Sequence, residues 1–163
     1  MLAVRRVGPG DVEAWARLRV GLMASEELVS PGTDAAVELE ASIVAWLRER
    51  LDSPSFGAFV AEEDGRVVGS GGISIYDVPP GPGPATREAY VMSMFTEPDA
   101  RGRGVARTVL AALLDFARQA GGVGRVWLRA SAMGRPAYLR AGFEPRDSYL
   151  QLWLEERSAD GPS

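Results

Sequence analysis

Two β-prone apolar runs separated by a short turn constrain this chain more than any other feature of its sequence. They lie within residues 56–76, FGAFVAEEDGRVVGSGGISIY, and flank Glu63-Asp64-Gly65. An Asp-Gly pair between such runs is typical of a β-hairpin, so the pattern predicts two adjacent antiparallel strands. The GSGG sequence at 69–72 lies inside the second run, where it indicates a bulge or a close approach of another backbone rather than a ligand loop.

Strand-like and helix-like patterns alternate around the hairpin. Apolar residues at strand spacing predict further strands at 2–7, 88–96, 125–130 and 148–156. Apolar residues at helical spacing predict helices after a cap at Asp11, after a cap at Thr33 or Asp34, at about 104–120 and after Ser131. The order is therefore β-α-α-β-β-β-α-β-α-β, which indicates an α/β fold with a mixed sheet covered by helices.

Residues that break regular structure bear on the domain organisation. Four prolines and two glycines in residues 77–87 predict a loop. The length of 163 residues fits one domain, and the sequence contains no repeat and no internal linker. We therefore expect a single domain over residues 1–157 and a flexible tail over 158–163.

The composition excludes several kinds of catalytic and metal site. The chain has no cysteine and no histidine, and all 18 of its basic residues are arginine. A thiolate nucleophile, a Ser–His triad, a Walker lysine and a Schiff-base lysine are therefore excluded, and we expect no metal site. The net charge of −4 argues against a nucleic-acid partner. Because no apolar run approaches the length of a membrane span, we expect a cytoplasmic protein without a membrane partner.

Arginines and glycines stand immediately before the helix expected at about 104–120, in the stretch TEPDARGRGVARTVL. The first turn of a helix leaves backbone N–H groups without partners, and the helix dipole makes that end partly positive. Gly102 and Gly104 would let the backbone approach an anion, and Arg101 and Arg103 would add fork-shaped donors. The turn therefore predicts a phosphate site, with a solvated turn as the alternative. It fits neither the dinucleotide fingerprint nor a Walker A loop.

The same residues carry a family resemblance. Arg101-Gly102-Arg103-Gly104-Val105-Ala106 matches the R/Q-x-x-G-x-G/A signature of the Gcn5-related N-acetyltransferases (GNAT). The second half of that family's pattern, a Tyr-x-x-x-Gly-Phe ending, is found at 138–143 as YLRAGF. The expected element order agrees with the family over residues 2–156. The chain thus resembles this family, which implies a mostly antiparallel mixed sheet with a splayed central strand pair and helices on both faces.

The resemblance implies that acetyl-CoA is the co-substrate and lies in the opening between the two splayed strands. Its pantetheine would run beside the backbone of Met94, Phe95 and Thr96. Its pyrophosphate would lie on the turn formed by Arg101, Gly102, Arg103, Gly104, Val105 and Ala106. Ser131 stands where many members carry an asparagine that holds the cofactor, and its hydroxyl still donates a hydrogen bond but reaches less far.

The resemblance also implies direct transfer of the acetyl group to a primary amine within a ternary complex. Tyr138 occupies the position of the acid that protonates the departing thiolate, with aromatic packing as the alternative. Glu88, at the start of the cofactor strand, is the candidate base for the amine, with a solvated carboxylate as the alternative. Glu26 and Glu27 are further candidates. A CoA-binding regulatory module that has lost turnover is the alternative function.

The partners expected are acetyl-CoA and an amine acceptor, either a small molecule or a protein. Tyr149 and Trp153 lie on the last expected strand, an edge that often forms homodimers in this family. They are therefore candidates for a homodimer contact, with packing within the sheet as the alternative.

Overall fold

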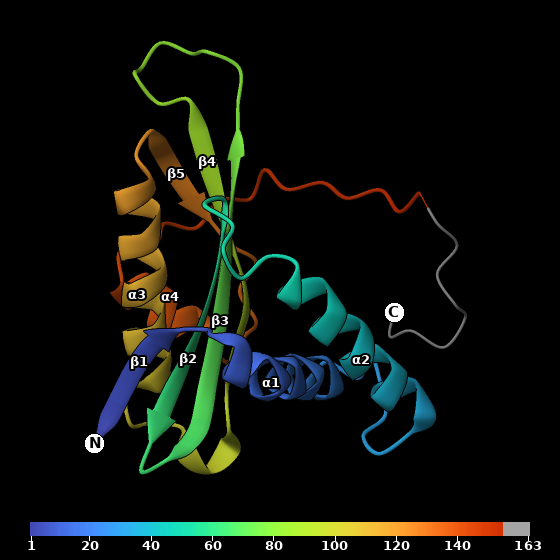
Figure 1. Cartoon of the computed structure of the whole chain (residues 1–163). Coiled ribbons are helices and arrows are strands. Elements are labelled where there is room, and N and C mark those ends of the chain that lie inside the picture. The colour runs from blue at the N-terminus through green and yellow to red at the C-terminus, as the bar shows by residue number, and fades with distance from the viewer. Residues whose placement is uncertain (155–163) are drawn as a thin grey trace.

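The predicted hairpin forms the second and third strands in the computed structural model, which describes residues 1–154 (Figure 1). Five strands lie in the order β1-β2-β3-β4-β5. Their bounds are Leu2–Arg6, Phe56–Glu63, Arg66–Asp77, Arg87–Thr96 and Val123–Trp127. The first three strand pairs are antiparallel, and β4 and β5 are parallel. The predicted α/β fold with a mixed, mostly antiparallel sheet is therefore confirmed.

Helices cover both faces of this sheet. Within the described residues the α-helices are α1 (Val12–Ser25), α2 (Asp34–Arg48), α3 (Val105–Ala120) and α4 (Arg135–Arg140). Helices α1 and α2 lie on one face, and α3 lies on the other (Figure 1). Each face has its own apolar cluster, and these clusters include Val105, Val109 and Leu113 under α3, and Trp15, Ile43 and Leu47 under α1 and α2.

Side chains near the starts of α1 and α2 accept hydrogen bonds from backbone amides in two different ways. The Thr33 hydroxyl accepts the Ala36 amide at 3.3 Å and so caps α2 as predicted. The Asp11 carboxylate makes no such bond at the start of α1. It accepts the Gly8 amide at 3.0 Å and pairs with Arg5 at 2.7 Å, which closes the short 3-10 turn before α1. Asp11 therefore stands at the N-cap position of α1 as predicted, but its side chain does not make the capping bond.

The glycines of β3 allow α3 to approach the sheet closely. A Cβ at Gly69 would lie 2.3 Å from Val105 Cγ1, and one at Gly71 would lie 2.7 Å from Val109 Cγ1. Side-chain carbons do not approach other atoms this closely, so glycine is required at both positions. Of the two alternatives predicted for 69–72, the bulge is confirmed by the shift of register between Ser70 and Gly72, and the close approach is made by side chains of α3 rather than by a backbone. This contact holds the start of α3 against β3.

The strand predicted at 148–156 is wrong over its described part. Residues 148–154 form no strand and run away from the sheet as an extended segment (Figure 1). Leu150, Leu152 and Leu154 are 95%, 84% and 92% exposed. The alternating apolar pattern is present, but a strand also needs a neighbouring backbone for its hydrogen bonds. Residues 155–156 and the tail expected at 158–163 lie outside the described residues.

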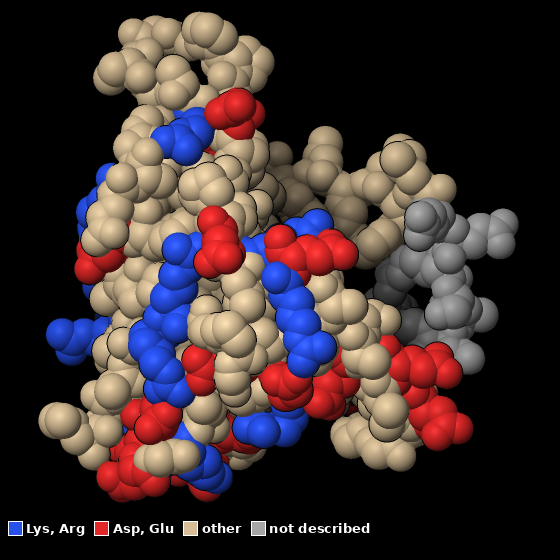
Figure 2. Space-filling view, viewed as in Figure 1, with Lys and Arg blue, Asp and Glu red and all other residues tan. Residues whose placement is uncertain are grey.

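The loop between β3 and β4 projects beyond the sheet, as its prolines and glycines predict (Figure 1). It carries no charged residue over 78–86, whereas acidic and basic side chains intermingle over much of the face shown in Figure 2. Across residues 1–154 we find no helix that is both long enough and apolar enough to cross a membrane.

Candidate active site

A bulge in β4 changes which face its side chains point to. Gly72 pairs with Met92 and Ser70 pairs with Phe95, so the single residue Gly71 faces two residues of β4. One of them is Ser93, whose φ is 57°. Met92 packs on the α1–α2 side before the bulge, and Met94 packs on the α3 side after it. The bulge therefore shifts the alternation of β4 by one residue.

Strands β4 and β5 separate soon after they meet. Their pairing runs from Arg87 with Val123 to Tyr90 with Trp127, where β5 ends three residues before the predicted 130. Beyond Tyr90, no strand within residues 1–154 covers this side of β4. Met94, Phe95 and Thr96 lie on this uncovered stretch, which gives them an open backbone edge.

The turn before α3 has the backbone geometry of an anion site. Gly102 and Gly104 have φ values of 76° and 83°, which a residue with a Cβ adopts only under strain. A Cβ at either position would meet nothing within 4 Å, so the space above the turn is open. Helix α3 starts at Val105, and the amides of its first turn have no intrahelical acceptor. These amides, including that of Ala106, point to the open space at the positive end of the helix.

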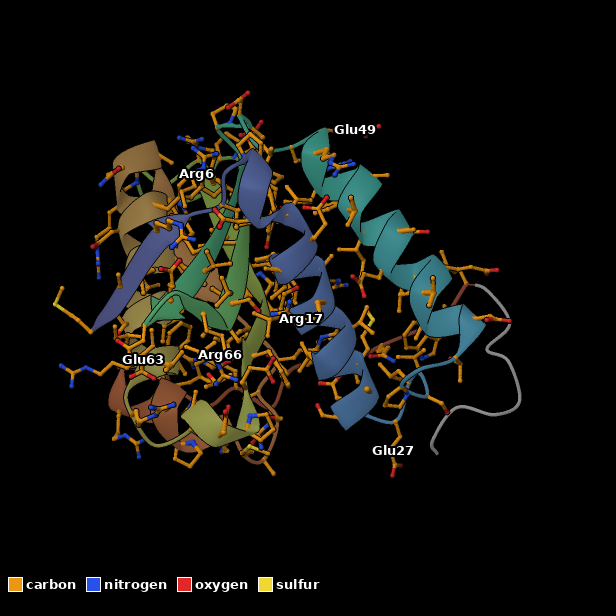
Figure 3. The ribbon with its side chains drawn as sticks, turned by 60° about the horizontal axis from the view of Figure 1, so that its bottom comes forward. Arg6, Arg17, Glu27, Glu49, Glu63 and Arg66 are labelled. Atoms are coloured by element: carbon orange, nitrogen blue, oxygen red, sulfur yellow. The ribbon has the colours of Figure 1, made fainter. Side chains whose placement is uncertain are left out.

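The two arginines of this turn are engaged by other parts of the protein. Arg103 pairs with Glu63 of β2 at 2.6 Å and also donates to the Asp99 carbonyl at 3.0 Å (Figure 3 labels Glu63). Arg101 donates to the Thr96 carbonyl at 3.2 Å. Each guanidinium keeps further N–H donors, since the bond of Arg101 uses only its Nε. Contacts of the two guanidinium groups with a phosphate stay a prediction.

Tyr138 on α4 is held in an apolar setting that keeps its hydroxyl protonated. Its ring packs edge-on against Phe143, with 5.9 Å between ring centroids, and joins the cluster under α3. Burial, and to a smaller extent the neighbouring Tyr90, raises the pKa of Tyr138 to about 12. Within residues 1–154 its hydroxyl makes no hydrogen bond, so it remains available to a ligand. Such a group carries its proton at neutral pH and is able to act as an acid.

Glu88 lies where β4 and β5 are still paired. Its carboxylate accepts from Arg125 at 2.7 Å and from the Tyr76 hydroxyl at 3.0 Å. The hydrogen bond from Arg125 lowers the pKa of Glu88 below its usual value, against the opposing effect of desolvation. Glu88 is therefore ionised at neutral pH. Trp127 of β5 donates to the same Tyr76 hydroxyl, so Glu88 belongs to a hydrogen-bond network that links side chains of β3, β4 and β5.

The remaining predicted residues lie at the edges of the site. The Ser131 hydroxyl accepts the Gly134 amide at 3.1 Å in the turn before α4 and keeps its own proton for donation. Glu26 and Glu27 are both exposed at the end of α1, and Glu27 points away from the molecule (Figure 3). In the described chain, no cluster of three potential metal ligands is present.

Sequence reasoning missed Tyr90, Arg129 and Arg19, which the fold brings beside the separating strands. Tyr90 packs against Trp127 with 4.5 Å between ring centroids, and Arg129 donates to the Tyr90 hydroxyl at 3.4 Å. Arg19 reaches across from α1 and donates to the Ser93 hydroxyl at 2.5 Å. Side chains alternate along β4, so Tyr90 lies on the same face as Met92. This alternation is the only sequence pattern that could have indicated a place for Tyr90 in the site. An arginine on a helix carries no such signal.

Comparison with known proteins gives a family and a set of similar folds. Residues 21–143 match the model of the acetyltransferase (GNAT) family. A predicted acetyltransferase from Clostridium acetobutylicum, solved with acetyl-CoA, is 26% identical with a TM-score of 0.79, and the match covers 94% of this chain and 97% of that chain. No curated protein matches the chain.

Two further solved structures are similar in fold. A GCN5-related N-acetyltransferase from Ralstonia eutropha JMP134 is 23% identical with a TM-score of 0.75, over 95% of this chain and 100% of that chain. An aminoglycoside N-acetyltransferase in complex with CoA is 20% identical with a TM-score of 0.72, over 97% of this chain and 96% of that chain.

We predict that Gly104→Asp weakens CoA binding about tenfold or more, because it sets a carboxylate at the start of α3, where we expect the pyrophosphate to bind. Isothermal titration with CoA measures the effect. Gly32→Asp is the matched control, since it makes the same charge change at a glycine with φ 73° and open surroundings. Unchanged affinity in a folded Gly104→Asp protein would contradict the placement of the pyrophosphate.

Proposed function

The chain belongs to the acetyltransferase (GNAT) family, and we propose that it moves an acetyl group from acetyl-CoA to a primary amine by direct transfer in a ternary complex. One observation carries the proposal: the uncovered edge of β4 at residues 91–96 leads directly to the glycine turn at the start of α3. An extended chain that ends in a pyrophosphate needs such an edge followed by such an anion site. The Clostridium structure, similar over nearly the whole chain, contains acetyl-CoA.

The residues of this path fit acetyl-CoA as the co-substrate. The backbone of Met94, Phe95 and Thr96 would pair with the pantetheine amides along the open edge of β4. The amides of the turn at 102–106 would hold the pyrophosphate, for which the surroundings of both glycines leave room. Ser131 would donate its hydroxyl proton to the cofactor from the turn before α4.

We assign the acid and base roles to Tyr138 and Glu88. The neutral amine nitrogen attacks the thioester carbonyl carbon, the C–S bond breaks, and Tyr138 donates its proton to the departing sulfur. The nitrogen then loses its second proton to become the amide, and that proton returns through water to the Tyr138 oxygen. The attacking ammonium must first lose a proton, which Glu88 would accept through water because its carboxylate is ionised at neutral pH. The acceptor amine belongs to a small molecule or a protein, and the cytoplasmic location stays a prediction.

A CoA-binding module without turnover is the second candidate function. It is favoured by one observation, since the bond from Arg125 lowers the pKa of Glu88 and a weakly basic carboxylate removes a proton from an ammonium inefficiently. Turnover with any amine decides between the two candidates.

We predict that Tyr138→Phe lowers kcat about 100-fold or more and changes the KM for acetyl-CoA little, because only the proton donor is removed. Release of CoA is measured with a thiol reagent, which reads CoA alone because the chain has no cysteine. Since the pKa of Tyr138 is about 12, its ionisation causes no loss of rate below about pH 10. Full activity in Tyr138→Phe would remove the acid role.

The base role of Glu88 is separated from a structural role by comparing Glu88→Gln with Arg125→Gln. Both variants break the same ion pair, but only the second keeps the carboxylate. We expect kcat/KM to fall about tenfold or more in Glu88→Gln. Without Arg125 the pKa of Glu88 rises, so the low-pH fall in the rate of Arg125→Gln should move to higher pH. Equal losses in both variants, with no shift of the pH profile, would show that Glu88 acts only through its bonds.

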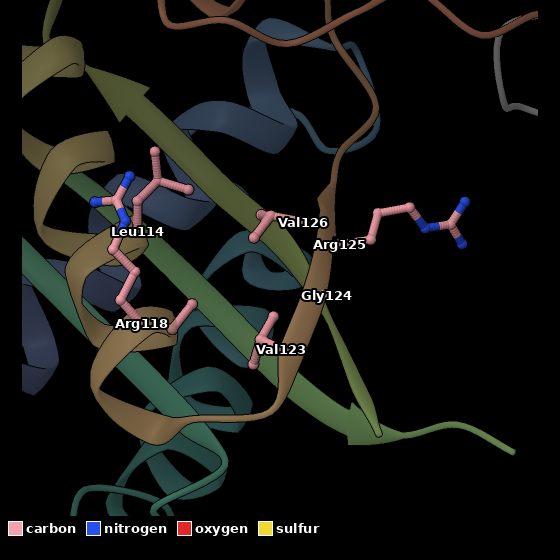
Figure 4. Close-up of a pocket in the computed structure, with 7 residues that line it drawn as sticks. Leu114, Arg118, Val123, Gly124, Arg125 and Val126 are labelled. Atoms are coloured by element: carbon pink, nitrogen blue, oxygen red, sulfur yellow. The ribbon is translucent and has the colours of Figure 1, made fainter. Parts of the chain in front are cut away.

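We also propose that the protein is a homodimer in which each copy places residues 148–154 on the sheet of the other. The leucines of this segment are almost fully exposed in its own chain. The outer edge of β5 has no neighbouring strand within residues 1–154. Beside it lies a hollow of about 190 Å³ between α3 and β5 (Figure 4). Its lining combines the apolar side chains of Leu114, Ala117, Val123 and Val126 with Arg118, Gly124 and Arg125. If the segment of one copy pairs with β5 of the other, the edge of β5 gains backbone hydrogen bonds and the leucines are buried in the hollow. Two such contacts related by a two-fold axis give a closed dimer.

Light scattering should therefore give twice the 17.4 kDa mass of the chain. The double variant Leu150→Ser, Leu152→Ser should shift the protein to monomer, because it removes the apolar face that enters the hollow. The control is Leu28→Ser with Val37→Ser, two exposed apolar residues elsewhere on the surface. A monomeric wild-type protein would overturn the dimer.

A further inference from the structure

Arg19 is a half-buried cation that forms no ion pair within residues 1–154, and the acidic residue that acts on its charge, Glu26, does so without direct contact. Its guanidinium donates to the Ser93 hydroxyl at the bulge of β4. Two other arginines within residues 1–154 are half-buried, and the charge of each is offset by more hydrogen-bond or ionic partners than that of Arg19. Arg50 pairs with its neighbouring glutamate at 3.5 Å, and Arg87 donates to two carbonyls at the end of α3. Because burial without a counter-charge costs free energy, the position of Arg19 calls for a ligand.

Arg19 lines a pocket of about 250 Å³ between α1, α2 and β4. The walls are formed by Trp15, Arg19, Ser42, Ile43, Trp46 and Met92. Apolar and aromatic surfaces around a few polar groups are typical of a small-molecule site, and here the polar groups are one guanidinium and one hydroxyl. Trp46 is fixed between Phe56, at 4.9 Å between ring centroids, and the guanidinium of Arg50, at 4.2 Å. The pocket is therefore already formed without a ligand.

The pocket lies next to the proposed path of acetyl-CoA. Met92 of its wall comes directly before the bulge, and Met94, the second residue of the bulge, lies on the open edge of β4. Arg19 contacts Ser93, the residue between them. A group bound to Arg19 is therefore held beside the point where the acceptor must meet the thioester.

We propose that this pocket binds the acceptor, and that the acceptor is a small amine carrying a carboxylate that pairs with Arg19. This rests on the proposed acetyl transfer at the same site. A guanidinium has five N–H donors in a fork that matches a carboxylate, and the bond to Ser93 uses one of them. The pocket is small for a ligand site, so it suits a compound of amino-acid size with an apolar side chain against Trp15 and Trp46.

The test compares matched acceptors that differ only in the charge. Rates of CoA release are measured with L-valine, L-leucine, L-methionine and L-phenylalanine and with the carboxamide of each. We expect kcat/KM to be about tenfold or more higher for the acids, because a charge-assisted pair in a partly buried site is lost in the amides. The difference should lie in KM, since the pair forms on binding. Arg19→Gln should bring the ratio of acid to amide close to one.

Arg17→Gln is the matched control, because Arg17 is exposed on the same helix and the variant makes the same charge change (Figure 3). It should leave the ratio unchanged. Arg19→Lys keeps the charge without the fork and should give an intermediate ratio. Equal rates for acids and amides in the wild-type protein, or an unchanged ratio in folded Arg19→Gln, would overturn the inference.

Binding separates this inference from the proposed function. The CoA-saturated wild-type protein is melted with each acid and each amide, and the acids alone should raise the melting temperature. No rise with any of the acids overturns the carboxylate site. Turnover of amines without a carboxylate, such as a diamine, would still uphold acetyl transfer. Absence of turnover with every amine, together with stabilisation by the acids, would contradict the proposed function and leave the site standing.

Discussion

The bulge at Ser93 is the constraint on which the rest of the site depends. A non-glycine residue at φ 57° costs of order 1 kcal/mol, so surrounding contacts must hold it there. Ser70 donates to the Ser93 carbonyl at 3.2 Å, and Arg19 donates to its hydroxyl. Trp15 donates to the Gly71 carbonyl at 3.0 Å, on the opposite strand. The bulge is thus fixed from both β3 and α1, and it sends Met92 and Met94 to opposite faces.

The parallel pairing of β4 with β5 places the anion site at the end of the bulged strand. A parallel pair needs a crossover, here provided by α3, so the start of that helix lies at the carboxyl end of β4. Gly69 and Gly71 let the helix lie directly on β3, which keeps its first turn close to the edge of β4. The open edge and the free amides therefore form one surface, and the bulge places the pocket at Arg19 beside it.

The parts of this fold that the sequence predicts are those set by local chemistry. The Asp64-Gly65 turn, the Thr33 cap and the glycines before α3 each act within a few residues, so their patterns are readable in the chain. The contact of Arg19 with Ser93 joins residues 74 apart, and neither side chain is unusual for its element. The segment 148–154 shows the converse case. Its alternation is that of a strand, but pairing depends on a neighbouring edge that the local pattern does not specify.

Because residue 19 is an arginine and not a lysine, the half-buried cation keeps its charge. Burial would lower the pKa of a lysine at residue 19, so that its side chain could lose its proton and become neutral. An arginine stays charged under the same conditions, although burial lowers the pKa of Arg19. The chain therefore keeps a permanent positive charge against apolar walls, with a hydroxyl as its partner at the bulge. A carboxylate on the ligand gains from that charge, which Glu26 offsets only without direct contact, whereas a cationic group placed against Arg19 would be repelled. The pocket at Arg19 thus selects by charge before it selects by shape.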